Sequence, residues 1–387
     1  MVQKVLSLDG GGTWAMLQAM ALQDLFPDMP GHQILAHFDL AVANSGGSIV
    51  LGGLVEDMRP NEIIALFNEP HKRAGIFAKA SVVESLLSHI PIFPKYSTAG
   101  KLIGLKSAFG TMGDVYLENL PSQPGWPKGP GGDDVRIMIV AFGYDSKRAC
   151  FFRSYGTAHG AEADEIPLVE AVHASSDAPV RFFDAPTEFG KHRYWDGAMA
   201  GLNNPLMAGI IDLLGEGVKA DEIVALSMGT GAVRMVPRTA TVAPPPDLAQ
   251  ALEQPGVLAD VAKAAGCITD DPPDTATFST HIILSAARGA DPTVAGPVVR
   301  LSPMIRPILD GQAWRLPDGL TDDQFHQLTK LSMDAVDQPQ VDLITALGNA
   351  WIAGHVRNQA IRMSTDDLAT SLGEDLYADA KARWLTL

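Results

Sequence analysis

Short apolar runs alternate with stretches of helical spacing through the first half of the chain. Residues 5–8 are apolar and lead into Asp9 and three glycines, and residues 14–26 then place leucines and methionines at helical spacing. A second apolar run, residues 38–43, precedes a helix predicted from about 48 to 58. Further strands are predicted at 135–142, 150–155 and 222–228, with helices at 167–174 and 205–214. This alternation favours an α/β fold with a mostly parallel central sheet and helices on both faces.

The amino-acid composition of the chain changes in its second part. Around residues 243–246 it becomes rich in proline and acidic residues, which indicates a surface loop or linker. Helical patterns follow at 341–351 and 366–384. We therefore divide the chain into a core, residues 1–235, and a Pro-rich acidic loop with a mixed or helical C-terminal extension packed on that core, residues 236–387.

Composition narrows the class of protein. The 387 residues are 46% hydrophobic, and 29 Lys+Arg against 45 Asp+Glu give a net charge of −16. Such a chain is globular, and its acidity argues against a nucleic-acid partner, because phosphate binding needs a basic field. Two cysteines, with no CxxC or HExxH spacing, offer neither a disulfide framework nor a metal site. We expect no metal and no cofactor, and the sequence leaves the oligomeric state open.

Nothing in the sequence resembles a targeting or membrane-spanning segment. The longest apolar stretch, residues 38–55, is broken by Asp39 and by polar residues at 44–48, whereas a bilayer span needs about 20 mostly apolar residues. We therefore expect a cytoplasmic protein, with leaderless secretion left open.

Residues 71–112 depart from the acidic average. This segment holds one acid, Glu84, and six basic residues: Lys72, Arg73, Lys79, Lys95, Lys101 and Lys106. The preferred interpretation is a solvated loop. The alternative is a flexible cover over the active site that makes transient contact with an anionic membrane surface, where each basic residue contributes about 1 kcal/mol.

Three short motifs suggest chemistry. The first, residues 43–47 (ANSGG), lies between a predicted strand and a helix and nearly matches G-x-S-x-G, a sharp turn that exposes a serine hydroxyl. Ser45 is the serine, and Gly46 and Gly47 let strand and helix approach closely. Alone, the motif is also compatible with plain tight packing.

The second motif is Asp9 with Gly10, Gly11 and Gly12 after the first strand. Consecutive glycines can expose successive amides and form a nest for an anion. That anion could be the oxyanion of an ester intermediate or a phosphate, since the run resembles the nucleotide loop of actin-like sugar kinases. In those kinases the loop continues into a β-hairpin, whereas here a helical pattern follows at once. A plain tight turn is a third interpretation.

The third motif is Asp196 with Gly197, followed by an Asn-Asn-Pro run at 203–205. An aspartate before glycine commonly forms a turn, and alone this one has no stronger interpretation.

Taken in order, the three motifs resemble those of the patatin-like phospholipases, D-G-G-G-x-R-G, G-x-S-x-G and D-G-A/G. Three further stretches resemble the family: residues 174–179 (ASSDAP), 203–205 (NNP) and 226–231 (LSMGTG). The resemblance covers roughly residues 2–235. It implies a patatin-like three-layer sandwich with extra C-terminal helices, and a lipid acyl hydrolase that acts on lipid or acyl-ester substrates.

The resemblance also implies roles for single residues. Ser45 would be the nucleophile and Asp196 the base that takes its proton, as a Ser-Asp dyad without histidine. The amides of Gly10, Gly11 and Gly12 would form the oxyanion hole. Asp9, Gly46, Gly47 and Gly197 would support these groups, and we expect His173 and His192 to be structural.

Two departures from the family pattern affect substrate choice. Trp14 and Ala15 stand where the family commonly has Arg-Gly, and Ala43 replaces the first glycine of the serine motif. A missing guanidinium weakens phosphate contacts, which favours neutral or short acyl esters, or phospholipids held through their tails. The alternatives are a weak or inactive lipid- or partner-binding relative and, less favoured, an acyl-carrier transacylase or a sugar kinase. The sequence does not indicate chain length, head group or positional preference.

Overall fold

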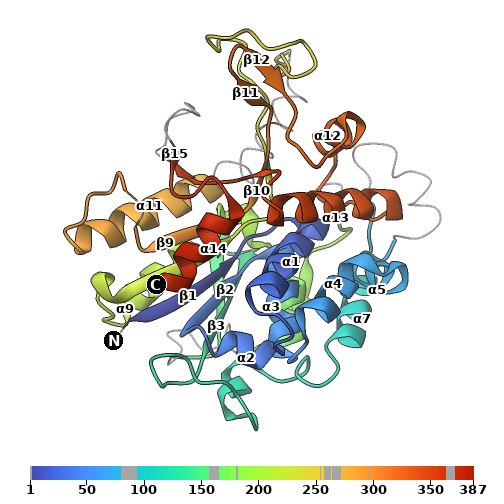
Figure 1. Cartoon of the computed structure of the whole chain (residues 1–387). Helices are drawn as coiled ribbons and strands as arrows, with labels where there is room; N and C mark the ends of the chain where they lie inside the picture. Colours follow the sequence, from blue (N-terminus) through green and yellow to red (C-terminus); the bar gives the residue numbers. More distant parts are fainter. Residues whose placement is uncertain are drawn as a thin grey trace.

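The computed structural model describes residues 2–79, 94–156, 165–179, 182–252, 254–256, 263, 272–294, 296–362 and 371–387. An eight-stranded sheet forms its centre, in the order β5-β6-β3-β2-β1-β7-β9, with β4 paired to β3 (Figure 1). The strands are β1 (Gln3–Leu8), β2 (Leu40–Ala43), β3 (Arg136–Gly143), β4 (Arg148–Arg153), β5 (Thr187–Phe189), β6 (His192–Asp196), β7 (Ile223–Met228) and β9 (Val298–Leu301). The pairings β3-β2-β1-β7-β9 are parallel, whereas β6, β5 and β4 join antiparallel.

Helices connect and cover the strands. The α-helices are α1 (Met16–Leu25), α2 (Gly31–Leu35), α3 (Ser45–Val55), α4 (Pro60–Asn68), α5 (Pro70–Ile76), α7 (Thr98–Ala108), α8 (Leu168–Ser175), α9 (Leu206–Gly215), α11 (Pro272–Ala287), α12 (Asp322–Leu328), α13 (Gln338–Ile352) and α14 (Tyr377–Thr386). Single turns of 3-10 helix lie at η1 (Gly12–Ala15), η2 (Leu117–Ser122), η3 (Gly197–Ala200) and η4 (Ala220–Glu222). Within these described ranges, every helix is too short or too polar to cross a bilayer.

Alternating residues of the central strands enter two separate cores. Leu6 and Leu8 of β1 pack into the larger cluster with α1, α3, α8 and α13, whereas Val5 packs into the smaller one with α9 and α11. This is the two-residue period of a strand buried on both faces. The predicted α/β fold with a mostly parallel sheet and helices on both faces is therefore confirmed.

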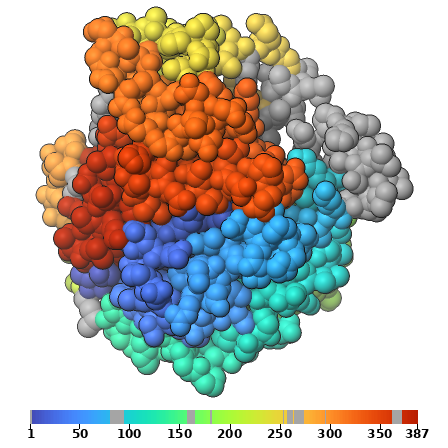
Figure 2. All heavy atoms as spheres, turned by 45° about the vertical axis from the view of Figure 1, so that its right-hand side comes forward, coloured from blue at the N-terminus to red at the C-terminus, as the bar shows by residue number. Residues whose placement is uncertain are grey.

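The C-terminal part is joined to the rest by a strand as well as by helices. Strand β9 extends the main sheet beside β7, α13 packs on α1, and α14 packs on β9. In Figure 2 the orange and red surface of this part lies directly against the blue N-terminal surface. Short strands complete it: β8 (Ala232–Val233) with β10 (Pro303–Ile305) and β13 (Arg357–Asn358), β11 (Ile308–Asp310) with β12 (Ala313–Arg315), and β14 (Ile361–Arg362) with β15 (Ser371–Leu372).

Most predicted elements lie within a few residues of the observed ones, with one shift that matters. The helix predicted from about residue 48 begins at Ser45, so the serine is its first residue. The predicted helix at 366–384 is observed as α14 only from Tyr377, and residues 366–370 lie outside the described residues. The prediction is wrong at Ser371–Leu372, which form strand β15 by pairing with β14.

Candidate active site

Ser45 occupies a sharp turn between β2 and α3. Its φ of 50° is left-handed, which is uncommon for a residue with a side chain and marks local backbone strain. The two following glycines are required by space, because a Cβ on Gly46 would lie 2.5 Å from the Gly12 carbonyl oxygen and one on Gly47 would lie 2.5 Å from that of Leu8. The Ser45 amide donates to the hydroxyl of Ser175, 3.0 Å away. The turn is therefore held from both sides, and it fixes the hydroxyl at the end of the strand.

Asp196 lies at the end of β6, close to that hydroxyl. Strand β3 lies between β2 and β6 and pairs with both, Ile139 with Ala43 and Ala141 with Asp196, which brings the two ends together. The Ser45 hydroxyl lies close enough to the Asp196 carboxylate to favour its ionised form.

The Asp196 carboxylate is almost fully buried, with 4% of the residue exposed, and it is hydrogen-bonded from several sides. It accepts a hydrogen bond from the Ala198 amide at 2.8 Å and from the Asn44 side-chain amide at 3.1 Å. Burial raises the pKa of Asp196, and the Ser45 hydroxyl and the hydrogen bonds from Ala198 and Asn44 oppose that rise. Gly197 has no room for a side chain, because a Cβ there would meet the Asn44 side-chain oxygen.

The glycine loop passes beside Ser45. A Cβ on Gly10 would lie 2.8 Å from the Ser45 Cβ, so the loop approaches the serine as closely as its backbone allows. The Gly10 amide donates to the Asn203 carbonyl at 2.8 Å, and it is therefore already used. In the described part of the chain, the amides of Gly11 and Gly12 have no such acceptor. Of the three amides predicted for an oxyanion hole, the Gly10 amide is already hydrogen-bonded, whereas those of Gly11 and Gly12 remain available to an oxyanion. Gly10 instead lets the loop approach Ser45 closely.

A buried ion pair lies beneath the loop. Asp9 Oδ2 accepts a hydrogen bond from Arg300 Nη2 at 2.6 Å, and Arg300 Nη1 donates to the Ser227 hydroxyl at 2.7 Å. Burial outweighs the guanidinium and raises the pKa of Asp9 to about 6. Sequence analysis missed Arg300, although a lone arginine inside the apolar run of β9 was a visible signal.

The first part of the chain matches a known family. Residues 6–121 match the family model of the patatin-like phospholipases. The patatin-like resemblance is confirmed. A stretch of 208 residues is 28% identical to a "cGAMP-activated phospholipase" of Pseudomonas aeruginosa, covering 53% of this chain and 55% of that protein. The match thus spans about half the length of this relative.

Two solved structures show a weaker likeness to this chain. The crystal structure of VipD from Legionella pneumophila has a TM-score of 0.37 and 12% identity, over 90% of this chain and 67% of the other. That of the type III effector protein ExoU has a TM-score of 0.25 and 12% identity, over 73% and 53%. At these scores the likeness adds nothing to the fold described above.

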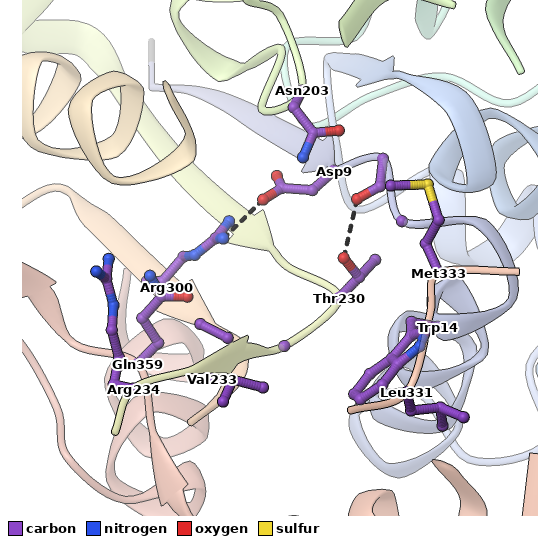
Figure 3. Close-up of a pocket in the computed structure, with 14 residues that line it drawn as sticks. Asp9, Trp14, Asn203, Thr230, Val233, Arg234, Arg300, Leu331, Met333 and Gln359 are labelled. Atoms are coloured by element: carbon purple, nitrogen blue, oxygen red, sulfur yellow. Dashed lines mark hydrogen bonds and ion pairs between the residues drawn. The ribbon is translucent and has the colours of Figure 1, made fainter. Parts of the chain in front are cut away.

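The patatin-like motif departs from its pattern at Trp14, which lines a pocket of about 350 Å³ beside the glycine loop (Figure 3). Its indole Nε1 donates to the Ser332 carbonyl at 3.1 Å, and Leu331 lies next to the ring. The pocket also includes Gly10 and Gly11, and its remaining lining residues are Asp9, Asn203, Thr230, Gly231, Ala232, Val233, Arg234, Arg300, Met333 and Gln359. Gly10 therefore lies beside Ser45 and also lines this pocket.

The basic segment is more internally paired than predicted. Lys101 is 1% exposed beside Asp177, Arg73 is buried and donates to the Phe67 carbonyl, and Lys95 Nζ lies 2.7 Å from Asp334. Both interpretations are therefore wrong for Lys101, because its side chain is buried. Much of the described part of the segment forms helices α5 and α7 and not a solvated loop. Lys79 and Lys106 are exposed, and Glu84 lies outside the described residues.

The two histidines near the motifs have different surroundings. His173 is buried on α8, where its Nε2 lies 3.0 Å from the Thr98 carbonyl oxygen. His192 is exposed at the start of β6. Among the described residues, no cluster of three or more His, Cys, Asp or Glu side chains is arranged to hold a metal ion.

Proposed function

We propose that this chain is a lipid acyl hydrolase that forms an acyl-enzyme on Ser45, with Asp196 as general base. The strained turn that holds Ser45 beside the glycine loop, with its hydroxyl next to the buried Asp196 carboxylate, is the observation that carries the proposal. The patatin-like match over residues 6–121 supports the general class of lipid acyl hydrolases.

The geometry suggests how the reaction proceeds. Asp196 accepts the Ser45 proton as the hydroxyl oxygen attacks the ester carbonyl carbon, and the carbonyl oxygen becomes an oxyanion. The amides of Gly11 and Gly12 donate to that oxyanion, and a well-placed donor contributes roughly 3–4 kcal/mol to the transition state. The C–O bond then breaks, the leaving alcohol takes the proton from Asp196, and the acyl group stays on Ser45. Water attacks the acyl-serine in the second half and gives up a proton to Asp196, which returns it to Ser45.

Substrate preference follows from the pocket beside the loop. Trp14 stands in place of the family's arginine in the wall of this pocket, and the two guanidinium groups that also line it, those of Arg234 and Arg300, are paired with Asp274 and Asp9. We infer that neutral or short acyl esters, or phospholipids held through their tails, are preferred. Turnover of a p-nitrophenyl ester relative to phosphatidylcholine tests this, and a strong preference for the phospholipid contradicts it.

Membrane contact, if it involves the basic segment, uses the exposed Lys79 and Lys106. We propose salt-sensitive binding to anionic vesicles through these two side chains. The Lys79→Glu/Lys106→Glu variant should then bind less, whereas unchanged binding leaves only the solvated-loop interpretation.

Two substitutions test the dyad. Ser45→Ala and Asp196→Asn should each reduce ester hydrolysis by a factor of at least about 100. Ser107→Ala and Asp114→Asn, at exposed positions, are the matched controls and should keep the activity. Rates equal to wild type in both dyad variants contradict the proposal. The named relative is activated by cGAMP, so the assay includes an arm with cGAMP to detect activity that needs an activator.

The same assay separates the alternatives. A chain that binds lipid vesicles but hydrolyses no ester, with or without cGAMP, is the inactive lipid-binding relative. The sugar-kinase interpretation requires a hairpin after the glycine loop, whereas the loop here continues into η1 and α1.

A further inference from the structure

Three ionisable side chains are buried together next to Ser45. Lys101 comes from α7, Asp177 follows α8, and Asp196 ends β6, and all three are almost completely buried. Lys101 Nζ lies 3.6 Å from Asp177 Oδ1 and 4.2 Å from the centroid of the Phe183 ring. The carbonyl of Asp177 accepts the amide hydrogen of Asp196 at 3.0 Å. The backbones of Asp177 and Asp196 are therefore bonded to each other, and the Lys101 ammonium lies beside Asp177 and interacts electrostatically with both carboxylates.

The contacts of Lys101 are poor for a residue that serves stability. In the described part of the chain, neither its Nζ nor Asp177 Oδ1 has a partner within hydrogen-bond distance. A buried ion pair often stabilises a fold no better than apolar side chains of the same volume, and here the pair also lacks good hydrogen bonds. Buried charges beside a candidate catalytic group more often tune that group.

The charges of the three buried side chains indicate that Lys101 affects the ionisation of the two carboxylates. Two carboxylates buried near each other resist being ionised together, so that one of them takes up a proton. A base that accepts the Ser45 proton has to be ionised before the reaction. The positive charge of Lys101 favours the ionised form of both Asp177 and Asp196, whereas burial opposes it in each.

We propose that Lys101 is a positioning residue that keeps Asp196 ionised by offsetting the buried charge of Asp177. This inference rests on the proposed function of Asp196 as the base. Nothing in the family motifs includes Lys101, and the sequence suggested a surface role for it.

The other charged and polar groups around the cluster are accounted for. On α8, the interaction with His173 favours the ionised form of Asp177, and Glu170 pairs with Lys106 at 3.4 Å. The Thr187 hydroxyl donates to Asp177, and the Thr98 hydroxyl donates to the Ala185 carbonyl. The Asn44 side-chain amide and the Ala198 amide donate to Asp196, and the Ser45 hydroxyl also favours its ionised form. On β6, the exposed Arg193 pairs with Asp145.

The pH dependence of kcat/KM for ester hydrolysis tests the proposal through its acid limb, where activity appears as the base ionises. Lys101→Met should move this limb to higher pH by about one unit, because Asp177 and Asp196 then compete for ionisation. Asp177→Asn should move it to lower pH, because Lys101 then acts on Asp196 alone. In Lys101→Met/Asp177→Asn both charges are gone, and the limb should return toward its wild-type position.

Lys128→Met, which removes an exposed lysine that pairs with Asp134, is the matched control and should leave the limb in place. Denaturant unfolding of each variant shows whether it folds. Should Lys101→Met not fold, the other two variants still give different expectations, a limb at lower pH in Asp177→Asn and a limb near the wild-type position in the double variant. If Lys101 only supports the structure, its replacement lowers kcat/KM by the same factor at every pH. The acid limb then stays in place in every variant, and that result overturns the proposal.

The control Ser45→Ala distinguishes this failure from a failure of the dyad. Loss of activity in Ser45→Ala with an unmoved limb in the Lys101 and Asp177 variants rejects Lys101 alone. Full activity in Ser45→Ala rejects the proposed function, and the role of Lys101 with it.

Discussion

Arg300 and Asp9 form a buried ion pair directly under the glycine loop, with Arg300 Nη2 2.6 Å from Asp9 Oδ2. The two residues come from opposite ends of the sequence, on β9 and after β1. The pair therefore ties the loop beside Ser45 to the C-terminal part of the chain.

Removing the cation should destabilise the fold strongly. Arg300→Met leaves Asp9 buried without its partner, and we expect a loss of about 3–5 kcal/mol in the free energy of unfolding at pH 8. The loss should be smaller at pH 5, where the unpaired Asp9 takes up a proton. Denaturant unfolding at the two pH values measures both effects. Arg193→Met, which breaks an exposed pair with Asp145, is the control and should change stability far less.

The ionisation of Asp9 should also make the free energy of unfolding depend on pH. Its pKa is raised from an ordinary value of 3.8 to about 6 in the folded chain, so the folded state binds the proton more tightly than the unfolded state. The stability from this group is then fully present below pH 3.8 and is lost as pH rises through about 6, by up to about 3 kcal/mol. Asp9→Asn should remove this slope. Equal slopes in wild type and Asp9→Asn between pH 4 and about 6 contradict it.

Gly47 should not tolerate alanine. A Cβ there would lie 2.5 Å from the Leu8 carbonyl oxygen and 2.6 Å from that of Asp9, and neither backbone atom can move without shifting β1 or the glycine loop. We expect Gly47→Ala to cost about 1–3 kcal/mol and to lower ester hydrolysis. Gly110→Ala, where no atom lies within 4 Å of the added Cβ, is the control. Thermal and denaturant unfolding with activity assays on both variants check this.

Trp14 should control head-group preference. Trp14→Arg restores the cation of the family pattern beside the glycine loop and should raise the rate on phosphatidylcholine relative to a p-nitrophenyl ester. The change also removes the hydrogen bond to the Ser332 carbonyl, so stability is measured in parallel. Trp14→Phe keeps an aromatic ring without the guanidinium and should leave the ratio unchanged. The same ratio in Trp14→Arg as in wild type excludes the substrate argument.

Much of the fold could be predicted from the sequence because its signals are local. The apolar runs of β1, β2 and β7 and the helical spacing of α9 and α13 each indicate an element within a short window. The short strand β5, the edge strand β9 and the helices α4 and α5 escaped prediction. Their patterns are brief, and pairing or packing with distant segments determines them.

The residues of the candidate site likewise divide into those that a local motif predicts and those that only the fold brings together. Ser45, Asp196 and the glycine loop could be identified because each lies in a short motif of fixed spacing. Arg300 and Lys101 could not, since an isolated arginine or lysine carries no motif. Only the register of β9 against β7, and the packing of α7 on α8, place them beside Asp9 and Asp177. The burial of Lys101 in particular reverses what its basic neighbours suggest.

The central claim is that the Ser45 hydroxyl is activated by Asp196, and covalent labelling tests it most directly. A fluorophosphonate probe, which forms an adduct with an activated serine, is incubated with wild type, Asp196→Asn and the control Asp114→Asn, and the modified peptide is mapped by mass spectrometry. We expect one adduct, on Ser45, in wild type and in Asp114→Asn, and slow or absent labelling in Asp196→Asn. Labelling at another serine, or equal labelling of Ser45 in Asp196→Asn, contradicts the account.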